Sequence, residues 1–161
     1  MNSSERKYSF LEAKAKIEAW CAYQERCHFE VWTKLRTWNI DEEDTNTLIA
    51  DLITNNFLNE QRFAEAYVSG KVSIKKWGKS KIKAHLKQKR ISETLIKKAL
   101  TTIDETVYWD NLIHLATRKW HEKKGDGYSK RQKVSLFLYQ KGYEASLISE
   151  ALEHLLEKGL D

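Results

Sequence analysis

The chain of 161 residues contains no proline. Average usage of roughly 5% would give about eight prolines in a chain of this length. Because proline removes an amide donor and clashes inside a helix, its absence favours a chain that is helical nearly throughout. Four of the six glycines, Gly78, Gly125, Gly127 and Gly142, fall between segments of apolar periodicity. We therefore predict an all-α fold.

Start and stop signals divide the chain into helices. Ser9 and Ser129 fit the capping box, in which a Glu or Gln three residues later completes the pair of capping bonds. Asn59 and Ser92 are further candidate N-caps, and Gly142 suits the left-handed position that ends a helix. The predicted helices span residues 10–26, 28–38, 44–56, 60–76, 79–89, 93–104, 106–124, 130–141 and 144–157.

The same apolar positions recur in each third of the chain. In the middle helices, at spacings of 51 and 52 residues, the matching triplets are Val31, Ile82 and Val134; Leu35, Leu86 and Leu138; and Ile40, Ile91 and Tyr143. The third helices align if the first copy carries four extra residues within 41–47, which matches Leu48, Leu95 and Leu147; Ile49, Ile96 and Ile148; and Ile53, Leu100 and Leu152. Any amphipathic helix pair resembles any other, but identical Leu or Ile at three positions favours a genuine triplication.

A triplication of this kind predicts an elongated array of three tandem three-helix repeats. The expected repeats span residues 10–58, 59–104 (the basic one) and 105–158. Each repeat buries its apolar face against its own helices and its neighbours, so the array grows in one direction. Such an array presents a long curved surface rather than an enclosed pocket, which favours binding over catalysis.

The excess positive charge lies in one segment. Nine Lys or Arg residues and no acid occur between residues 71 and 90, and the whole chain is only +5, so the remainder is −4. A concentrated patch of this kind attracts an anionic polymer such as a nucleic acid. A solvated helix face is the ordinary alternative.

On the predicted helix 79–89 the cations Lys79, Lys83, Lys87 and Arg90 form one stripe beside the core face. No Glu alternates with them, so neighbouring charges repel. A stripe without carboxylate partners suggests an external partner, with phosphates the commonest candidate. With a second, weaker cluster in the third repeat, the candidate contact residues are Lys75, Lys76, Trp77, Lys79, Lys81, Lys83, Lys87, Lys89, Arg90, Arg118, Lys130 and Arg131.

The tryptophans have two expected roles. Four fall at helical spacing and are expected to fill the core or the joints between repeats, namely Trp20, Trp32, Trp109 and Trp120. Trp38 and Trp77 lie near predicted helix ends, where exposure is expected. Trp77 either stacks on a base, inserts into a partner's groove, or closes the joint between helices 60–76 and 79–89, and the structural role is favoured.

We expect no enzyme, cofactor or metal. Gly78-Lys79-Ser80 resembles the end of a phosphate-binding loop, but Ser73 stands where the first glycine is required. The five histidines show no ligand spacing. Cys21 and Cys27 lack the Cys-x-x-Cys spacing and are expected to be reduced thiols.

We expect a cytoplasmic monomer. No apolar run approaches the roughly 18 residues that cross a bilayer, and the N-terminal residues lack the apolar stretch of a secretory signal.

Two segments resemble the RecX family of bacterial recombinase regulators. They are Leu-Asn-Glu-Gln-Arg-Phe-Ala-Glu-Ala-Tyr-Val at 58–68 and the run from Lys76-Trp77-Gly78 through the basic helix to Ile91 and Ser92. Ala22 to Cys27 resembles the start of the family's first repeat. The family often has Gly where this chain has Asn39 and Arg90, and only Gly142 keeps it, so the local turn geometry is open.

The resemblance implies a protein that binds the RecA recombinase and lies in the helical groove of the RecA–DNA filament. Family members are described as restraining strand exchange, ATP hydrolysis and filament growth, without chemistry of their own. The chain would thus regulate recombination, DNA repair and the SOS response. The basic stripe would contact either acidic RecA surface or the phosphates of single-stranded DNA, and the sequence leaves this open.

The alternative is a stand-alone helical nucleic-acid-binding module, with helices 79–89 and 93–104 as a helix-turn-helix. Such modules read bases from the start of their second helix. Glu93 is poorly suited to that position because it would face phosphates.

Overall fold

The computed structural model describes residues 5–159. Over this range the chain is helical and contains no strand, which confirms the all-α prediction. The elements are α1 (Phe10–Tyr23), α2 (His28–Thr37), α3 (Glu42–Thr54), α4 (Glu60–Gly70), the π-helical turn η1 (Lys71–Lys75), α5 (Lys79–Gln88), α6 (Glu93–Leu100), α7 (Glu105–Glu122), α8 (Gly127–Gln140) and α9 (Ala145–Glu157). Residues 1–4, which belong to the segment expected to lack a secretory signal, lie outside the described residues.

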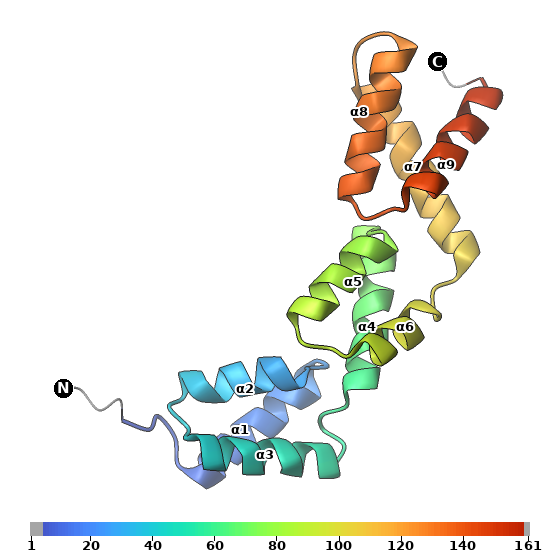
Figure 1. Ribbon diagram of the computed structural model, residues 1–161. Helices are drawn as coiled ribbons and strands as arrows, with labels where there is room; N and C mark the ends of the chain where they lie inside the picture. The colour runs from blue at the N-terminus through green and yellow to red at the C-terminus, as the bar shows by residue number, and fades with distance from the viewer. Residues whose placement is uncertain (1–4, 160–161) are drawn as a thin grey trace.

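The helices form three groups of three that follow one another in a crescent, so the predicted elongated array is confirmed (Figure 1). We call α1–α3 unit 1, α4–α6 unit 2 and α7–α9 unit 3. The second helix of each unit, α2, α5 or α8, lies toward the inside of the bend (Figure 1). The boundaries expected at residues 58 and 104 stay a prediction.

One turn is repeated after the second helix of every unit. The residues at this turn, Asn39, Arg90 and Gly142, have φ of 57°, 61° and 101°. In each copy the next amide donates back to a carbonyl five residues earlier, at 3.1–3.2 Å. This is a left-handed helix cap, which glycine adopts freely and other residues adopt at a cost of roughly 1–2 kcal/mol. The departures from glycine therefore leave the turn geometry unchanged.

The third helices begin at the same distance from this turn in all three units. Their N-caps, Asp41, Ser92 and Glu144, each follow directly after the turn's last apolar residue. The buried positions then match without a gap as Thr45, Ile96 and Ile148; Leu48, Ala99 and Ala151; and Leu52, Ile103 and Leu155. The predicted four-residue insertion within 41–47 is wrong. Because four residues are about one helical turn, the shifted alignment had the same apolar periodicity.

Within residues 5–159 the core consists of two clusters rather than three. One lies within unit 1 and includes Ile17, Leu35 and Leu52. The other runs without a break through units 2 and 3, from Phe63 to Leu155, and also takes in Cys27 from the start of α2. Units 2 and 3 therefore share an apolar core, whereas unit 1 has its own.

Several helix ends differ from prediction. Ser9, Asn59 and Ser92 are N-caps as expected. Ser129 is not, because α8 begins earlier and the Ser129 amide donates to the Asp126 side chain at 2.8 Å. Predicted helix 60–76 ends as an α-helix at Gly70, continues as the π-helical turn, and stops at left-handed Lys76, φ 53°. Predicted helix 93–104 ends at Leu100.

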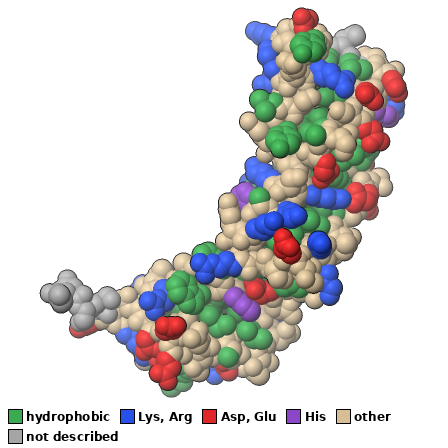
Figure 2. All heavy atoms as spheres, viewed as in Figure 1, with side chains coloured by type: hydrophobic (Ala, Val, Ile, Leu, Met, Phe, Trp, Pro, Cys, Tyr) green, Lys and Arg blue, Asp and Glu red, His purple; other side chains and the backbone are tan. Residues whose placement is uncertain are grey.

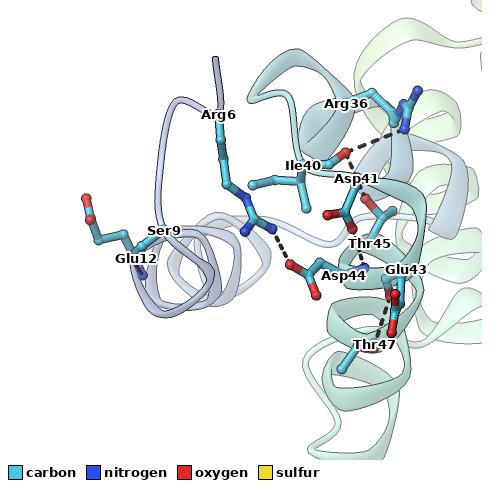
Figure 3. Close-up of polar contacts among 10 residues, drawn as sticks. All are labelled: Arg6, Ser9, Glu12, Arg36, Ile40, Asp41, Glu43, Asp44, Thr45 and Thr47. Carbon is cyan, nitrogen blue, oxygen red and sulfur yellow. Dashed lines mark hydrogen bonds and ion pairs between the residues drawn. The ribbon is translucent and has the colours of Figure 1, made fainter. Parts of the chain in front are cut away.

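Polar contacts fix the start of α3 against the N-terminal segment. The Asp41 carboxylate caps α3 by accepting from the Asp44 amide at 2.8 Å, and Asp44 pairs with Arg6 (Figure 3). Acidic residues are favoured at this end because the helix dipole places partial positive charge there. The acidic run 41–44 thus has a structural role.

Two tryptophans are placed contrary to expectation. Trp38, expected to be exposed, is buried in the unit 1 core and makes an edge contact with Tyr8 at 5.3 Å. Trp32, expected in the core or a joint, is 41% exposed, because the buried stripe of α2 is made by Val31 and Leu35. Trp120 is buried, and Trp20 and Trp109 are half-buried.

Candidate nucleic-acid interface

Helix α5 carries cations on both sides of its buried stripe. Ile82 and Leu86 are fully buried and hold α5 in the core of units 2 and 3. Because successive residues turn by 100°, Lys83 and Lys87 fall on one side of this stripe, and Lys81 and His85 fall on the other. These two flanks have different surroundings.

The flank that contains Lys79, Lys83 and Lys87 is partly neutralised. Lys79 pairs with Glu105 at 2.7 Å, and Lys87 pairs with Glu93 at 3.6 Å. The expectation that this stripe has no carboxylate partner is therefore wrong for Lys79 and Lys87, because the fold brings the starts of α7 and α6 against α5. Pairs this exposed contribute at most about 1 kcal/mol. Lys83 is exposed and has no carboxylate within 4.0 Å in residues 5–159.

Arg90 does not belong to the helical stripe. Helix α5 ends at Gln88, so the helical angle assigned to Arg90 does not apply. Its guanidinium lies 4.5 Å from the centroid of the Phe29 ring, at the joint with unit 1. The neighbouring Lys89 pairs with Glu30 across the same joint at 3.3 Å.

The opposite flank surrounds Trp77. The ammonium groups of Lys71 and Lys81 lie 4.7 and 4.5 Å from the Trp77 ring centroid, and the His85 ring lies 4.6 Å away. Burial lowers the pKa of His85, and the charges of Lys81, Lys71 and Lys89 lower it further. The Trp77 ring is half-buried and covered by these groups, which leaves it poorly placed to stack on a base.

Unit 3 adds cations to this flank. The ammonium groups of Lys119 and Lys141 lie 4.5 and 5.8 Å from the Phe137 ring centroid. Burial lowers the pKa of Lys141, and four cations lower it further: Lys81, Arg118, Lys119 and Lys75. We call Lys71, Lys75, Lys81, Arg118, Lys119 and Lys141 the joint cation cluster.

Much of the charge in the joint cation cluster is uncompensated. Arg118 and Lys119 share the carboxylate of Glu122, at 3.7 and 2.8 Å. Within the described part of the chain, no carboxylate lies within 4.0 Å of the remaining four, Lys71, Lys75, Lys81 and Lys141. The cluster therefore has the charge expected of an anion-binding surface.

Hydrogen bonds hold the backbone at the start of α5 against the turn after α8, so the segments that carry Lys81 and Lys141 stay together. The Gly78 amide donates to the Lys141 carbonyl at 2.8 Å, and the Ser80 amide donates to the Gly142 carbonyl at 3.0 Å. Two tyrosine hydroxyls complete the joint between units 2 and 3: Tyr108 accepts from the Lys79 amide at 2.9 Å, and Tyr143 donates to the Lys76 carbonyl at 2.8 Å.

The structure brings only some of the predicted contact residues together. Lys75, Lys81 and Arg118 belong to the joint cation cluster, and Trp77 lies inside it. Lys76 occupies the turn before α5, and Lys130 lies 5.5 Å from the buried Trp120 ring, with Arg131 next to it. The candidate contact residues named from the sequence omit Lys71 and Lys119, although both lie in the basic segments it identified, and sequence reasoning missed Lys141 altogether.

Charge differs strongly between the units. Residues 10–58 contain five Lys or Arg and nine Asp or Glu, residues 59–104 contain twelve and four, and residues 105–158 contain nine and eight. Figure 2 shows Lys and Arg side chains over the middle of the crescent and acidic side chains grouped on unit 1. Among residues 5–159 no cluster of His, Cys, Asp and Glu is able to hold a metal ion, and no helix combines the length and apolarity of a membrane span.

These features define a class of protein: an elongated array of three-helix units with a strongly cationic middle. Residues 59–100 match the second three-helix domain of RecX, and residues 106–152 match the third three-helix domain of RecX. The chain is 30% identical over 132 residues to the regulatory protein RecX of Chlorobium phaeobacteroides (strain BS1), covering 82% of this chain and 85% of the relative. The chain belongs to the RecX family of regulatory proteins, as the sequence resemblance predicted.

Other relatives agree with this assignment. The regulatory protein RecX of Clostridioides difficile (strain 630) is 28% identical over 148 residues, which cover 91% of this chain and 69% of the relative. The crystal structure of RecX from Lactobacillus salivarius superposes with a TM-score of 0.81 at 24% identity, over 91% of this chain and 96% of that one. At this identity the structural likeness shows the fold.

Proposed function

We propose that this RecX-family chain binds the RecA–DNA filament and restrains its recombinase and ATPase activity, without chemistry of its own. The observation that carries the proposal is the joint cation cluster, in which four lysines have no carboxylate partner within the described residues. The crescent provides an extended surface able to contact several protomers of a filament. The cluster provides attachment to its phosphates.

DNA phosphate fits this cluster better than a folded acidic surface does. The uncompensated groups are all lysines, which bind phosphate as flexible point charges and need no matching fixed geometry. The partly neutralised flank of α5 is more suitable for a protein surface, because Lys79 and Lys87 are already paired with carboxylates. Contact with both DNA and RecA would explain how one small chain recognises the filament rather than DNA or RecA alone.

The stand-alone nucleic-acid-binding alternative receives less support. A helix-turn-helix would place the start of α6 toward bases, but Glu93 at this position is exposed and pairs with Lys87. Tight, sequence-specific binding to DNA without RecA would favour this alternative.

A charge reversal tests the proposal. Lys75→Glu combined with Lys81→Glu removes two cluster cations that have no carboxylate partner, so we expect the helical circular dichroism to be unchanged, with stability lowered only by the lost contact of Lys81 with Trp77. We expect the double variant to inhibit the DNA-dependent ATPase of RecA more weakly than the wild type does. If both lysines contact a single strand, the dependence of log affinity on log salt should also become shallower by about 1.4.

Lys97→Glu combined with Lys98→Glu is the matched control. Both lysines are exposed on α6 and outside the cluster, and the change in net charge is the same. We expect this control to inhibit like the wild type. Equal inhibition by the wild type and the cluster variant would remove the cluster from the mechanism, and absence of inhibition by the wild type would refute the proposed function.

A further inference from the structure

We infer that the corner between units 1 and 2 is a binding pocket for an unpaired nucleobase, with Trp32 as its stacking surface. The inference rests on the proposed contact with DNA and adds that the DNA is held as a single strand, by a base as well as by phosphates. It assigns this role to Trp32 instead of Trp77.

The exposure of Trp32 is the first observation. Its side chain is 41% exposed, whereas the other tryptophans, all within residues 5–159, are half-buried or buried. Single exposed apolar side chains are common and need no explanation. Trp32 differs from such cases because its ring lines a cavity.

The cavity has the composition of a site for a planar ring. It measures about 280 Å³ and is lined by His28, Phe29, Trp32, Ile49, Glu60 and Arg90. This volume lies just below the usual range of ligand pockets, about 300–1,000 Å³, which suits one ring system rather than a helix or strand of a partner. The Glu60 carboxylate accepts from the His28 amide at 3.3 Å and lies 3.4 Å from the imidazole Nδ1, and the imidazole of His28 offers a hydrogen-bonding group to the edge of a base.

Two arginines supply charge beside this cavity. The Arg36 guanidinium lies 5.6 Å from the Trp32 ring centroid, and Arg90 lies over Phe29 in the cavity wall. No carboxylate lies within 4.0 Å of either guanidinium in the described range. Arg36 belongs to α2, and Arg90 follows the end of α5. Both helices lie on the inner side of the crescent (Figure 1).

A base with its phosphate satisfies both properties of the corner. Aromatic rings that stack on bases, flanked by cations that contact the backbone, are the usual arrangement in proteins that bind single strands. An acidic peptide would satisfy the arginines but would leave the aromatic surface uncovered. Duplex DNA would satisfy the arginines but has no unstacked base to insert.

The test compares two labelled strands of about twelve nucleotides, oligothymidine and an abasic strand with the same phosphates. The wild type should bind oligothymidine more tightly than the abasic strand. Trp32→Ala should weaken oligothymidine binding by about 5- to 150-fold, which corresponds to loss of one stacked base. It should leave abasic binding unchanged, and Trp32→Phe should retain most of the preference for bases.

Tyr23→Ala is the matched control, because Tyr23 is 85% exposed at the end of α1 and outside the cavity. It should bind both strands like the wild type. Equal binding of the two strands by the wild type, or an unchanged base preference in Trp32→Ala, would overturn the inference. Weaker RecA inhibition by Trp32→Ala with an unchanged base preference would identify Trp32 as a protein contact and would also overturn it. These measurements need no RecA, so failure of the proposed function would be recognised separately in the ATPase assay.

Discussion

Substitution of Gly78 by alanine tests whether units 2 and 3 form one rigid body. A Cβ atom at this position would lie 2.2 Å from the Gly142 carbonyl carbon and 2.3 Å from the Tyr143 nitrogen. Ordinary contacts of this kind exceed about 3.4 Å, so the two backbones must separate by roughly 1 Å. Gly78 has φ −80°, which alanine adopts without strain, so the cost arises from the contact alone.

The magnitude follows from the bonds that cross this contact. The amides of Gly78 and Ser80 donate across the joint at 2.8 and 3.0 Å, and both would lose their acceptors. Each donor left unsatisfied in this contact costs about 1–3 kcal/mol, so Gly78→Ala should lower the free energy of unfolding by roughly 2–6 kcal/mol. Urea unfolding followed by circular dichroism and tryptophan fluorescence measures this, and the transition of units 2 and 3 should broaden as they uncouple.

Two further variants separate the backbone contact from a change in helix capping or in glycine flexibility. Gly78 is also the N-cap of α5, where alanine is disfavoured, but Gly78→Ser supplies a good cap and the same Cβ atom, so it should be as unstable as Gly78→Ala. Gly70→Ala adds a Cβ with no atom within 4 Å and should stabilise the protein by about 0.5–1 kcal/mol. Recovery of stability in Gly78→Ser, or a loss below about 1 kcal/mol in Gly78→Ala, would refute the rigid joint.

Three other expectations concern the thiols, the left-handed turn and the joint between units 1 and 2. Burial raises the pKa of Cys21 to about 11 and that of Cys27 to about 12, so both should resist a disulfide reagent at about pH 8 and react on unfolding; rapid reaction of the native protein would contradict this. Lys76→Gly should raise the free energy of unfolding by about 1 kcal/mol in urea titrations, because it relieves a left-handed lysine at φ 53°. A lower free energy of unfolding than in the wild type would show that the lysine side chain contributes more than its backbone conformation costs. Salt at about 1 M should lower the temperature at which unit 1 melts relative to units 2 and 3, because the ion pairs Arg62–Glu25 and Lys89–Glu30 hold the joint between units 1 and 2. Calorimetry that finds the two transitions equally far apart with and without salt would exclude this.

The fold was predictable because its determinants are local and repeated. Val31, Ile82 and Val134 are all fully buried, as are Leu35, Leu86 and Leu138, so the apolar period identified the core face of each second helix. The third helices were shifted by one turn because helical periodicity alone does not distinguish neighbouring turns. The N-caps Asp41, Ser92 and Glu144 remove this ambiguity, because each follows directly after the repeated turn.

The candidate site was only partly predictable, because it depends on which distant segments meet. The sequence showed a surplus of lysines near α5 but not that Glu105 and Glu93 neutralise one flank. It could not show that Lys141 of unit 3 joins Lys81 of unit 2, since 60 positions separate them along the chain. Likewise, the exposure of Trp32 depends on which face of α2 meets α1 and α3. Because tryptophan is large and apolar, the sequence alone favoured a buried position for it.

The two joints of the crescent differ in a way that suits their proposed roles. Between units 2 and 3, backbone hydrogen bonds and a continuous core fix the segments that carry the cations, so the lysines need not first be brought together to bind phosphate. Between units 1 and 2, ion pairs of 2.6 to 3.4 Å and the buried Cys27 connect the two cores, and the proposed base pocket lies at their border. Ion pairs near the surface tolerate small displacements better than close backbone contacts, so this joint is the one able to adjust when a base enters. A rigid cationic part and an adaptable aromatic part would then bind the same strand by different physical means.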